Sequence, residues 1–238
     1  MRIFRATKMA FRFAPEPGEM LNGVTSNTLD AAHNALLSPQ GKIIGVFVQK
    51  LVDDQTCILV SDAYAAQALT GEFGKYAPFS KTGWEQLSEP VWYDLNGDAD
   101  PGDGMVLPLA AGRLIVGGNY EPTVSEEEFT TFRLDHQLPV HGVDFQDEMI
   151  LNVFPDGYVS YTKGCFVGQE VVARVHNLSA PQKKLVVKYE NECSDQEKQR
   201  MTSRQADASG RVRGFVFIST DDKGKRAEYQ AMKVKFKK

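Results

Sequence analysis

Two apolar runs joined by a short polar turn constrain the fold more than any other feature of this sequence. Ile43 to Val48 is rich in β-branched residues, and Cys57 to Val60 forms a second run of the same kind. Between them lies Asp53-Asp54-Gln55, which has the composition of a turn. The pattern predicts a β-hairpin over residues 43–60. The chain is therefore expected to build an antiparallel sheet around this hairpin.

Helix and strand patterns on both sides of the hairpin indicate an α+β fold. Ser125 precedes three glutamates, and a helix is expected from there to about His136, because serine caps a helix and acidic residues suit its first turn. Another segment is helix-prone at residues 63–69. Short strands are expected at residues 113–116, 185–187, 211–218 and 232–238, the last alternating lysine with apolar residues. We predict a body over residues 1–180 and a small C-terminal β domain over residues 181–238.

Composition excludes several classes of protein. The chain has 238 residues, 42% of them hydrophobic and 24% charged, and its formal net charge is −4. A net negative charge argues against general nucleic-acid binding. There is no apolar run of about 18 residues that would predict a membrane span, and the first ten residues lack the apolar segment of a secretory signal. The three widely spaced cysteines, Cys57, Cys165 and Cys193, favour free thiols in a reducing cytoplasm over disulfides.

Two patterns resemble metal-binding motifs but fail on spacing. Residues 94–104 form an acidic loop, but Ala99 stands where a calcium loop needs glycine, and Met105 stands where it needs a bidentate glutamate. His136 and His141 are five residues apart and form no zinc-binding His-Glu-x-x-His pattern. We therefore expect a solvated loop, structural histidines and no stably bound metal.

The segment Lys163-Gly-Cys-Phe-Val-Gly-Gln-Glu170 leaves two interpretations open. Apolar residues at 167, 171, 172 and 175 share one helical face, which places Cys165 at or near a helix start. There the helix dipole and Lys163 would favour a thiolate. Alternatively, Cys165 is buried and inert, as free cysteines often are, and the two glycines serve tight packing.

The same eight residues closely resemble the Lys-Gly-Cys-Tyr/Phe-x-Gly-Gln-Glu signature of the YgfZ-like folate-binding family, which is related to the glycine cleavage T-protein, an aminomethyltransferase. Three further stretches are similar in kind and order to elements of that family. They are Leu21-Asn-Gly-Val-Thr-Ser-Asn27, Ser38-Pro-Gln-Gly-Lys42 and Lys75-Tyr-Ala-Pro-Phe-Ser-Lys81. The resemblance extends over roughly residues 18–180.

This resemblance implies a fold and a role. The fold is an α+β, T-protein-like folate-binding body followed by a C-terminal β-barrel domain, here reduced in size. The role is tetrahydrofolate-dependent assembly or repair of iron–sulfur clusters in client enzymes. Cys165 would be the reactive or cluster-contacting thiol, and Arg174 would brace the Glu170 carboxylate four residues earlier. The folate would be held by Asn27, Phe129, Lys163, Gln169, Glu170 and Arg174.

Departures from the family pattern bear on the activity. T-proteins carry an aspartate pair in the strand after the glycine turn, whereas this chain has Ile43-Ile44-Gly45-Val46 there. Phe129 stands where a tryptophan is common in the family. The missing carboxylate weighs against the alternative of a folate-dependent aminomethyl transferase. A third possibility is a non-catalytic interaction protein with a vestigial pocket.

Overall fold

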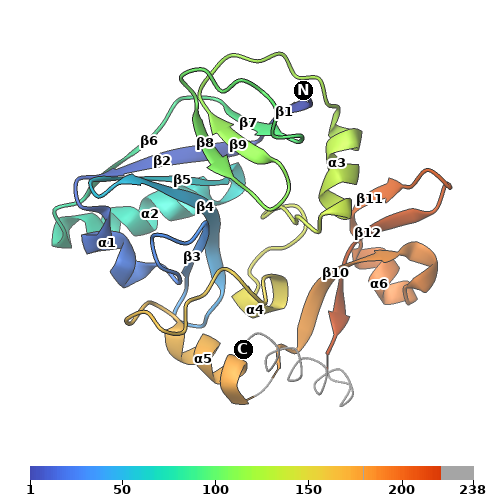
Figure 1. Cartoon of the computed structure of the whole chain (residues 1–238). Coiled ribbons are helices and arrows are strands. Elements are labelled where there is room, and N and C mark those ends of the chain that lie inside the picture. Colours follow the sequence, from blue (N-terminus) through green and yellow to red (C-terminus); the bar gives the residue numbers. More distant parts are fainter. Residues whose placement is uncertain (179, 221–238) are drawn as a thin grey trace.

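A computed structural model describes residues 1–178 and 180–220. Its central element is a five-stranded sheet in the order β3-β4-β5-β2-β6 (Figure 1). The strands are β2 (Lys8–Ala14), β3 (His33–Leu37), β4 (Ile43–Asp53), β5 (Thr56–Asp62) and β6 (Gly83–Gln86). All neighbours pair antiparallel, and β4 and β5 form the predicted hairpin, with Val48 opposite Val60. The hairpin prediction is therefore confirmed.

One face of this sheet is covered by two helices, α1 (Pro17–Val24) and α2 (Ala66–Tyr76), with the 3-10 turns η1 (Ala63–Ala65) and η2 (Ala77–Phe79) flanking α2 (Figure 1). Phe11, Phe13, Leu69 and Phe73 belong to the buried cluster between the sheet and these helices. Gly45 allows α2 to approach β4 closely, since a Cβ there would lie 2.7 Å from the Leu69 side chain. The predicted helix at residues 63–69 is present as η1 and the start of α2.

A second sheet has the order β1-β7-β9-β8 and faces helix α3 (Glu126–Asp135). Its strands are β1 (Ile3–Arg5), β7 (Val91–Asp94), β8 (Met105–Pro108) and β9 (Arg113–Val116). The predicted cap of α3 is confirmed, because the Glu128 amide donates to Ser125 Oγ at 3.2 Å. The loop of residues 94–104 is organised by Asp94, a buried carboxylate that accepts from the Arg113 side chain at 2.9 Å and from loop amides.

The remaining described residues form two short helices and a third sheet. The helices are α4 (Ile150–Val153) and α5 (Gln169–Leu178). The sheet has the order β10-β12-β11, with β10 (Lys183–Tyr189), β11 (Thr202–Ala206) and β12 (Val212–Ser219). The turn η3 (Glu190–Glu192) and helix α6 (Asp195–Arg200) connect β10 to β11. The third sheet lies beside α3 (Figure 1).

The C-terminal β-barrel that we expected is not seen over residues 180–220. There β10, β12 and β11 form an open three-stranded sheet, and residues 190–200 form a turn and a helix. It also shares a core with the body, since Leu185 and Phe215 pack in one buried cluster with Ile150 and Leu151. The predicted strand at residues 232–238 lies outside the described residues. Among the described helices, none has the length and apolar character needed to cross a membrane.

Candidate functional site

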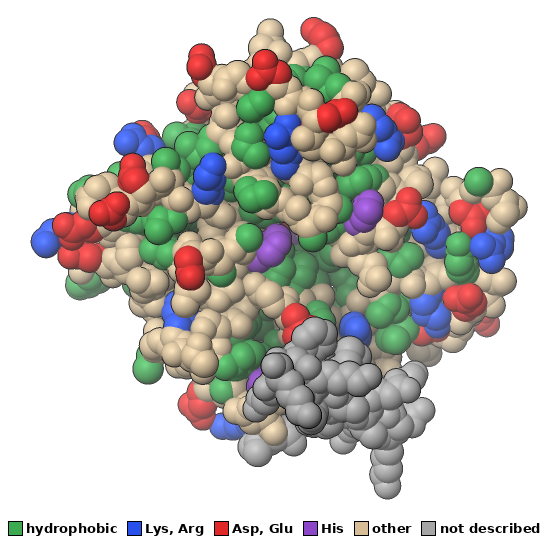
Figure 2. Space-filling model, in the orientation of Figure 1, with side chains coloured by type: hydrophobic (Ala, Val, Ile, Leu, Met, Phe, Trp, Pro, Cys, Tyr) green, Lys and Arg blue, Asp and Glu red, His purple; other side chains and the backbone are tan. Residues whose placement is uncertain are grey.

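A cavity of about 760 Å³ lies where the two large sheets, α3 and the loop after α3 meet. It opens as a hollow near the centre of one face of the molecule, with histidine at its margin (Figure 2). Its volume falls within the ~300–1,000 Å³ typical of small-molecule sites. Its walls are rich in aromatic side chains, namely Phe4, Phe47, Tyr64, Tyr93, Phe129, Phe154 and Tyr158. This lining suits a flat, largely apolar ring system.

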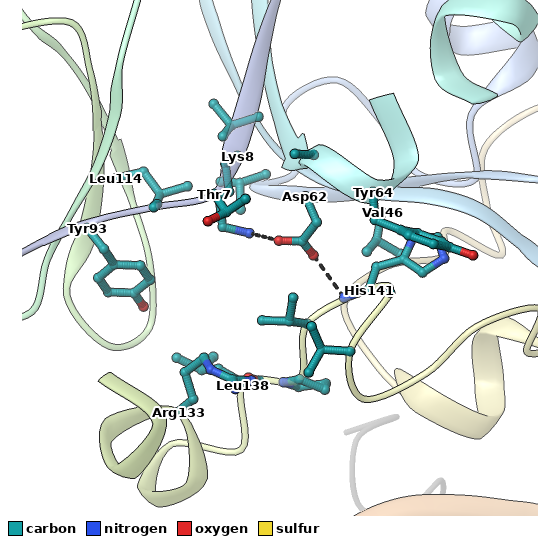
Figure 3. Close-up of a pocket in the computed structure, with 18 of the residues that line it drawn as sticks. Thr7, Lys8, Val46, Asp62, Tyr64, Tyr93, Leu114, Arg133, Leu138 and His141 are labelled. Carbon is teal, nitrogen blue, oxygen red and sulfur yellow. Dashed lines mark hydrogen bonds and ion pairs between the residues drawn. The ribbon is translucent and has the colours of Figure 1, made fainter. Parts of the chain in front are cut away.

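An ion pair between a partly buried lysine and a buried aspartate forms one wall of the cavity. Lys8 and Asp62 are cross-strand partners on β2 and β5, and the Lys8 ammonium contacts Asp62 Oδ1. The other carboxylate oxygen, Oδ2, accepts the main-chain N–H of His141 at 3.0 Å (Figure 3). The side chain of Asp62 is only 8% exposed. The carboxylate is thus fixed between a strand and a loop that are far apart in the sequence.

The second cationic side chain of the wall is also neutralised within the protein. Arg133 on α3 donates to Asp144 Oδ2 and to Ser203 Oγ, each at 2.8 Å, and the Asp144 side chain is fully buried. Ser203 belongs to β11 and donates to Asp144 Oδ1 at 2.5 Å. This network attaches the C-terminal sheet to the cavity wall. Lys8 and Arg133 are the lysine and arginine side chains among the described lining residues, and each forms an ion pair with a carboxylate of the protein. These described residues therefore offer no unpaired lysine or arginine to an anionic ligand.

Burial disfavours the charged form of two histidines in the lining. Burial lowers the pKa of His33 and of His141 below the usual value. The His141 ring stacks on Phe145 with centroids 4.9 Å apart, and the His33 ring lies 5.0 Å from that of Tyr158. The Nδ1 atoms of both rings are buried without a hydrogen-bond partner among the described residues. Adding a proton to either ring would place a charge in surroundings that do not solvate it.

The mouth of the cavity is held by a close contact between Tyr64 and Gly142. Gly142 has φ +91°, and a Cβ there would overlap the Tyr64 ring. Tyr64 is itself 57% exposed and meets the edge of His141 at 4.9 Å between centroids. Glycine at 142 therefore permits both the backbone turn and the position of the aromatic side chain at the opening.

The segment 163–170 docks against the other stretches that carry the family resemblance. The Lys163 ammonium donates to the carbonyl oxygens of Thr25 at 2.6 Å and Asn27 at 2.9 Å. Burial lowers its pKa to about 8. Gly168 has φ +84°, and a Cβ there would overlap the carbonyl oxygen of Ser38. We call this set of contacts, between residues 163–172 and residues 25–27 and 38–41, the signature clamp.

Cys165 is displayed by the signature clamp rather than buried in it. Its side chain is exposed, so of the two interpretations the one with a buried cysteine is wrong. The expected position at the helix start also differs, because α5 begins at Gln169. The cause is Gly168, whose positive φ keeps the preceding residues in a turn. Glu170 and Arg174 are exposed on α5 and form an ion pair of 2.8 Å.

The structure separates the residues that sequence reasoning assigned to one site. Phe129 lines the cavity, where its ring stacks on Phe4 with centroids 4.0 Å apart. Asn27 meets Lys163 through its carbonyl oxygen, and its side chain donates to the carbonyl of Gly157 at 2.9 Å. Lys163, Cys165, Gln169, Glu170, Arg174 and Asn27 are outside the cavity lining.

The cavity and the signature clamp are nevertheless neighbours. Tyr158 lines the cavity and stacks on Phe154, while its carbonyl oxygen accepts from Ser26 Oγ at 2.6 Å beside the clamp.

Four polar residues of the cavity wall were not predicted as site residues from the sequence, namely Lys8, Asp62, Arg133 and His141. A signal for Asp62 does exist, since it is a carboxylate at the end of an apolar strand. Among the described residues, no cluster of three or more potential metal ligands is present.

Comparisons with known proteins support the resemblance that the motifs indicated. The chain is 22% identical over 206 residues to a protein described as the mitochondrial iron–sulfur cluster assembly factor IBA57 homolog of Pyricularia oryzae, covering 72% of this chain and 52% of that relative. This chain thus spans about half the length of the curated relative that it matches. No family model matches the sequence.

A solved structure supports the same fold. The crystal structure of the glycine cleavage system aminomethyltransferase T from Bartonella henselae superposes with a TM-score of 0.68, covering 92% of this chain and 78% of that one at 14% sequence identity. This similarity extends the fold assignment over the body and the C-terminal sheet. The chain is therefore an α+β protein with a T-protein-like fold.

Proposed function

Starting from a chain that is homologous to an iron–sulfur cluster assembly factor and folded like an aminomethyltransferase, we propose that it binds tetrahydrofolate and supports assembly or repair of iron–sulfur clusters in client enzymes. The observation that carries the folate half of this proposal is the cavity of about 760 Å³ with aromatic walls and internally paired charges. The homology supports the cluster-assembly half.

The lining fits the ring system of a reduced folate better than its tail. The pyrimidine half of a reduced pterin is flat and neutral, and it can pack against aromatic side chains such as Phe129 and Tyr93. The glutamate tail is anionic, and the two cations of the wall already hold carboxylates. We therefore place the pterin inside the cavity and the tail toward its mouth. Bound folate would supply one-carbon carrier chemistry, while the protein binds and orients it.

Cys165 is the proposed point of contact with a cluster or a client. Its thiol is exposed on a turn whose two sides are fixed by Lys163 and Gly168. One cysteine cannot hold a cluster alone, because clusters usually take four protein ligands. Cys165 is thus proposed as a transient ligand or redox-sensitive thiol, and no stably bound metal is expected. Stoichiometric iron in purified protein with all three cysteines replaced would contradict this role.

The other residues that the family resemblance assigns to folate binding belong to the signature clamp or to α5, outside the cavity lining. The Asn27 side chain holds the Gly157 carbonyl beside Tyr158, and Lys163 donates to the Asn27 carbonyl oxygen from outside the cavity lining. Gln169, Glu170 and Arg174 lie on α5. Any contact of these residues with folate would involve its tail rather than the enclosed ring. The proposed partners are iron–sulfur client or assembly proteins, with no role for nucleic acid or a membrane.

A folate-dependent aminomethyl transferase is the second candidate, and the fold of the aminomethyltransferase neighbour favours it. The missing carboxylate in residues 43–46 weighs against it. An assay for methylene transfer from a glycine-derived donor separates the two, since clear turnover would favour the transferase. A non-catalytic protein with a vestigial pocket would show neither turnover nor folate binding.

Two measurements test the leading proposal. Calorimetric titration with tetrahydrofolate should show saturable binding, and no heat at millimolar ligand would overturn it. A deletion strain carrying Cys165→Ala should lose iron–sulfur enzyme activity relative to wild type, and full rescue would remove Cys165 from the mechanism. The relative's name places that protein in mitochondria, whereas our prediction from the sequence is a cytoplasmic location for this chain.

A further inference from the structure

Asp62 is a buried carboxylate that faces the cavity with acceptor capacity to spare. It stands at the end of β5, and its side chain is only 8% exposed although it belongs to the lining. Burying a carboxylate is costly unless it is paired and hydrogen-bonded. The costs are offset here by the Lys8 ammonium on Oδ1 and the His141 amide on Oδ2. The group is thereby fixed in position at the cavity wall.

The two existing partners do not exhaust this carboxylate. An ionised carboxylate has about four acceptor positions across its two oxygens. One position on each oxygen is used by a described residue, so each oxygen retains one. Figure 3 shows Asp62 between Lys8 and His141, with Tyr93 and Tyr64 on opposite sides of the cavity. A flat ligand between these walls would present its edge to Asp62.

The charges of the cavity wall indicate which hydrogen-bonding groups the edge of a ligand needs in order to bind Asp62. The other carboxylate among the described lining residues, Glu126, is exposed in the first turn of α3. Asp62 is thus the buried anion of the wall, with acceptor positions on both oxygens. A pair of adjacent, parallel N–H donors matches two carboxylate oxygens, as in bidentate guanidinium–carboxylate pairs. The 2-amino-4-oxopyrimidine half of a pterin has such a pair in its exocyclic amine and the neighbouring ring N–H.

We propose that Asp62 is the specificity-determining residue of the cavity and that it selects 2-amino-4-oxopyrimidine rings through both carboxylate oxygens. This inference rests on the proposed function, because it names the residue that would recognise the pterin ring of the folate by hydrogen bonds. Lys8 and the His141 amide act as positioning groups, since they hold the carboxylate in the cavity wall while each of its oxygens keeps one acceptor position. A ring with an oxygen in place of the 2-amino group would bring an acceptor against the carboxylate and be rejected.

The test uses pterin and lumazine, which differ at ring position 2 by an amino group against an oxo group. The full-length protein is titrated with each by fluorescence, and tetrahydrofolate is titrated by calorimetry. Wild type should prefer pterin by about 10- to 100-fold, the ratio expected for losing hydrogen bonds to a charged group. Asp62→Asn should reduce that ratio to a few-fold, because an amide presents one acceptor and one donor. Asp54→Asn makes the same chemical change in the exposed β4–β5 turn and should leave the ratio at its wild-type value.

The outcomes separate this inference from the proposal beneath it. Wild type that binds tetrahydrofolate but does not distinguish pterin from lumazine overturns the role of Asp62 alone. Wild type that binds none of the three ligands overturns the proposed folate site as well. A wild-type ratio that persists in Asp62→Asn also overturns the inference. If thermal melting shows that Asp62→Asn does not fold, Asp62→Glu takes its place, because it keeps the charge but shifts both oxygens by one methylene. A pterin-to-lumazine ratio that stays at the wild-type value in Asp62→Glu overturns the inference.

Discussion

The signature clamp and the central cavity are built in opposite ways. The clamp contains an eight-residue segment that is continuous in sequence, and its contacts are made largely through main-chain atoms and glycines. The cavity collects its polar side chains from β2, β5, α3 and the loop after α3. A conspicuous sequence motif therefore marks a rigid support and a displayed thiol. The enclosed space that fits a ligand is formed by scattered residues with no motif. Mutations in the two regions should have separable effects.

The largest loss of stability is expected from Gly168→Ala, because both the backbone conformation and the packing of the signature clamp require glycine at this position. The substitution strains a residue at φ +84° and drives a Cβ into the Ser38 carbonyl. We expect a loss of about 3 kcal/mol in the free energy of unfolding, measured by urea denaturation. Gly164→Ala is the matched control, because no atom lies within 4 Å of a Cβ there. Equal destabilisation by the two changes would show that the clamp does not depend on Gly168.

Lys163→Met tests whether the clamp supports stability or ligand binding. It removes the ammonium that the carbonyl oxygens of Thr25 and Asn27 accept from, and the Asn27 oxygen keeps only its bond from Asn34 Nδ2 at 3.0 Å and a longer one from Thr25 Oγ1. A loss of about 1–3 kcal/mol is expected. Pterin affinity should change little, since Lys163 is outside the cavity lining. Lys75→Met, on the exposed surface of α2, serves as the control for removing a lysine charge. A Lys163→Met protein of wild-type stability that fails to bind pterin would reverse the roles assigned to the two regions.

The difference between the two regions also explains what could be predicted from the sequence. The hairpin over residues 43–60 and the Ser125 cap depend on residues a few positions apart, so the sequence patterns found them. The Asp62–His141 hydrogen bond joins residues 79 positions apart, and the Lys163–Thr25 bond joins residues 138 apart. No local pattern specifies such pairs. The family signature located the clamp because it is continuous, but it carried no information about Lys8, Arg133 or Asp62.

A smaller effect, specific to the cavity, is expected when pH is lowered. The pKa values of His33 and His141 lie below the usual value in the folded protein, whereas the unfolded chain takes up protons near 6.5. The unfolded state then binds more protons, so stability should fall as pH decreases below about 6.5. His141→Phe keeps a ring against Phe145 and should flatten this dependence in melting experiments between pH 7 and 5. His136→Phe changes an exposed histidine and should not.

Cys165→Ser should have the smallest effect on the protein itself. Its side chain is exposed, so the free energy of unfolding should stay within about 0.5 kcal/mol of wild type. Pterin affinity should also be unchanged, because Cys165 is outside the cavity lining. A loss of iron–sulfur enzyme activity in cells, on top of wild-type stability and pterin binding, would assign the defect to the thiol. If stability or pterin binding fell as well, the thiol would be a structural part of the clamp, and the separation between a displayed cysteine and an enclosed ligand site would not hold.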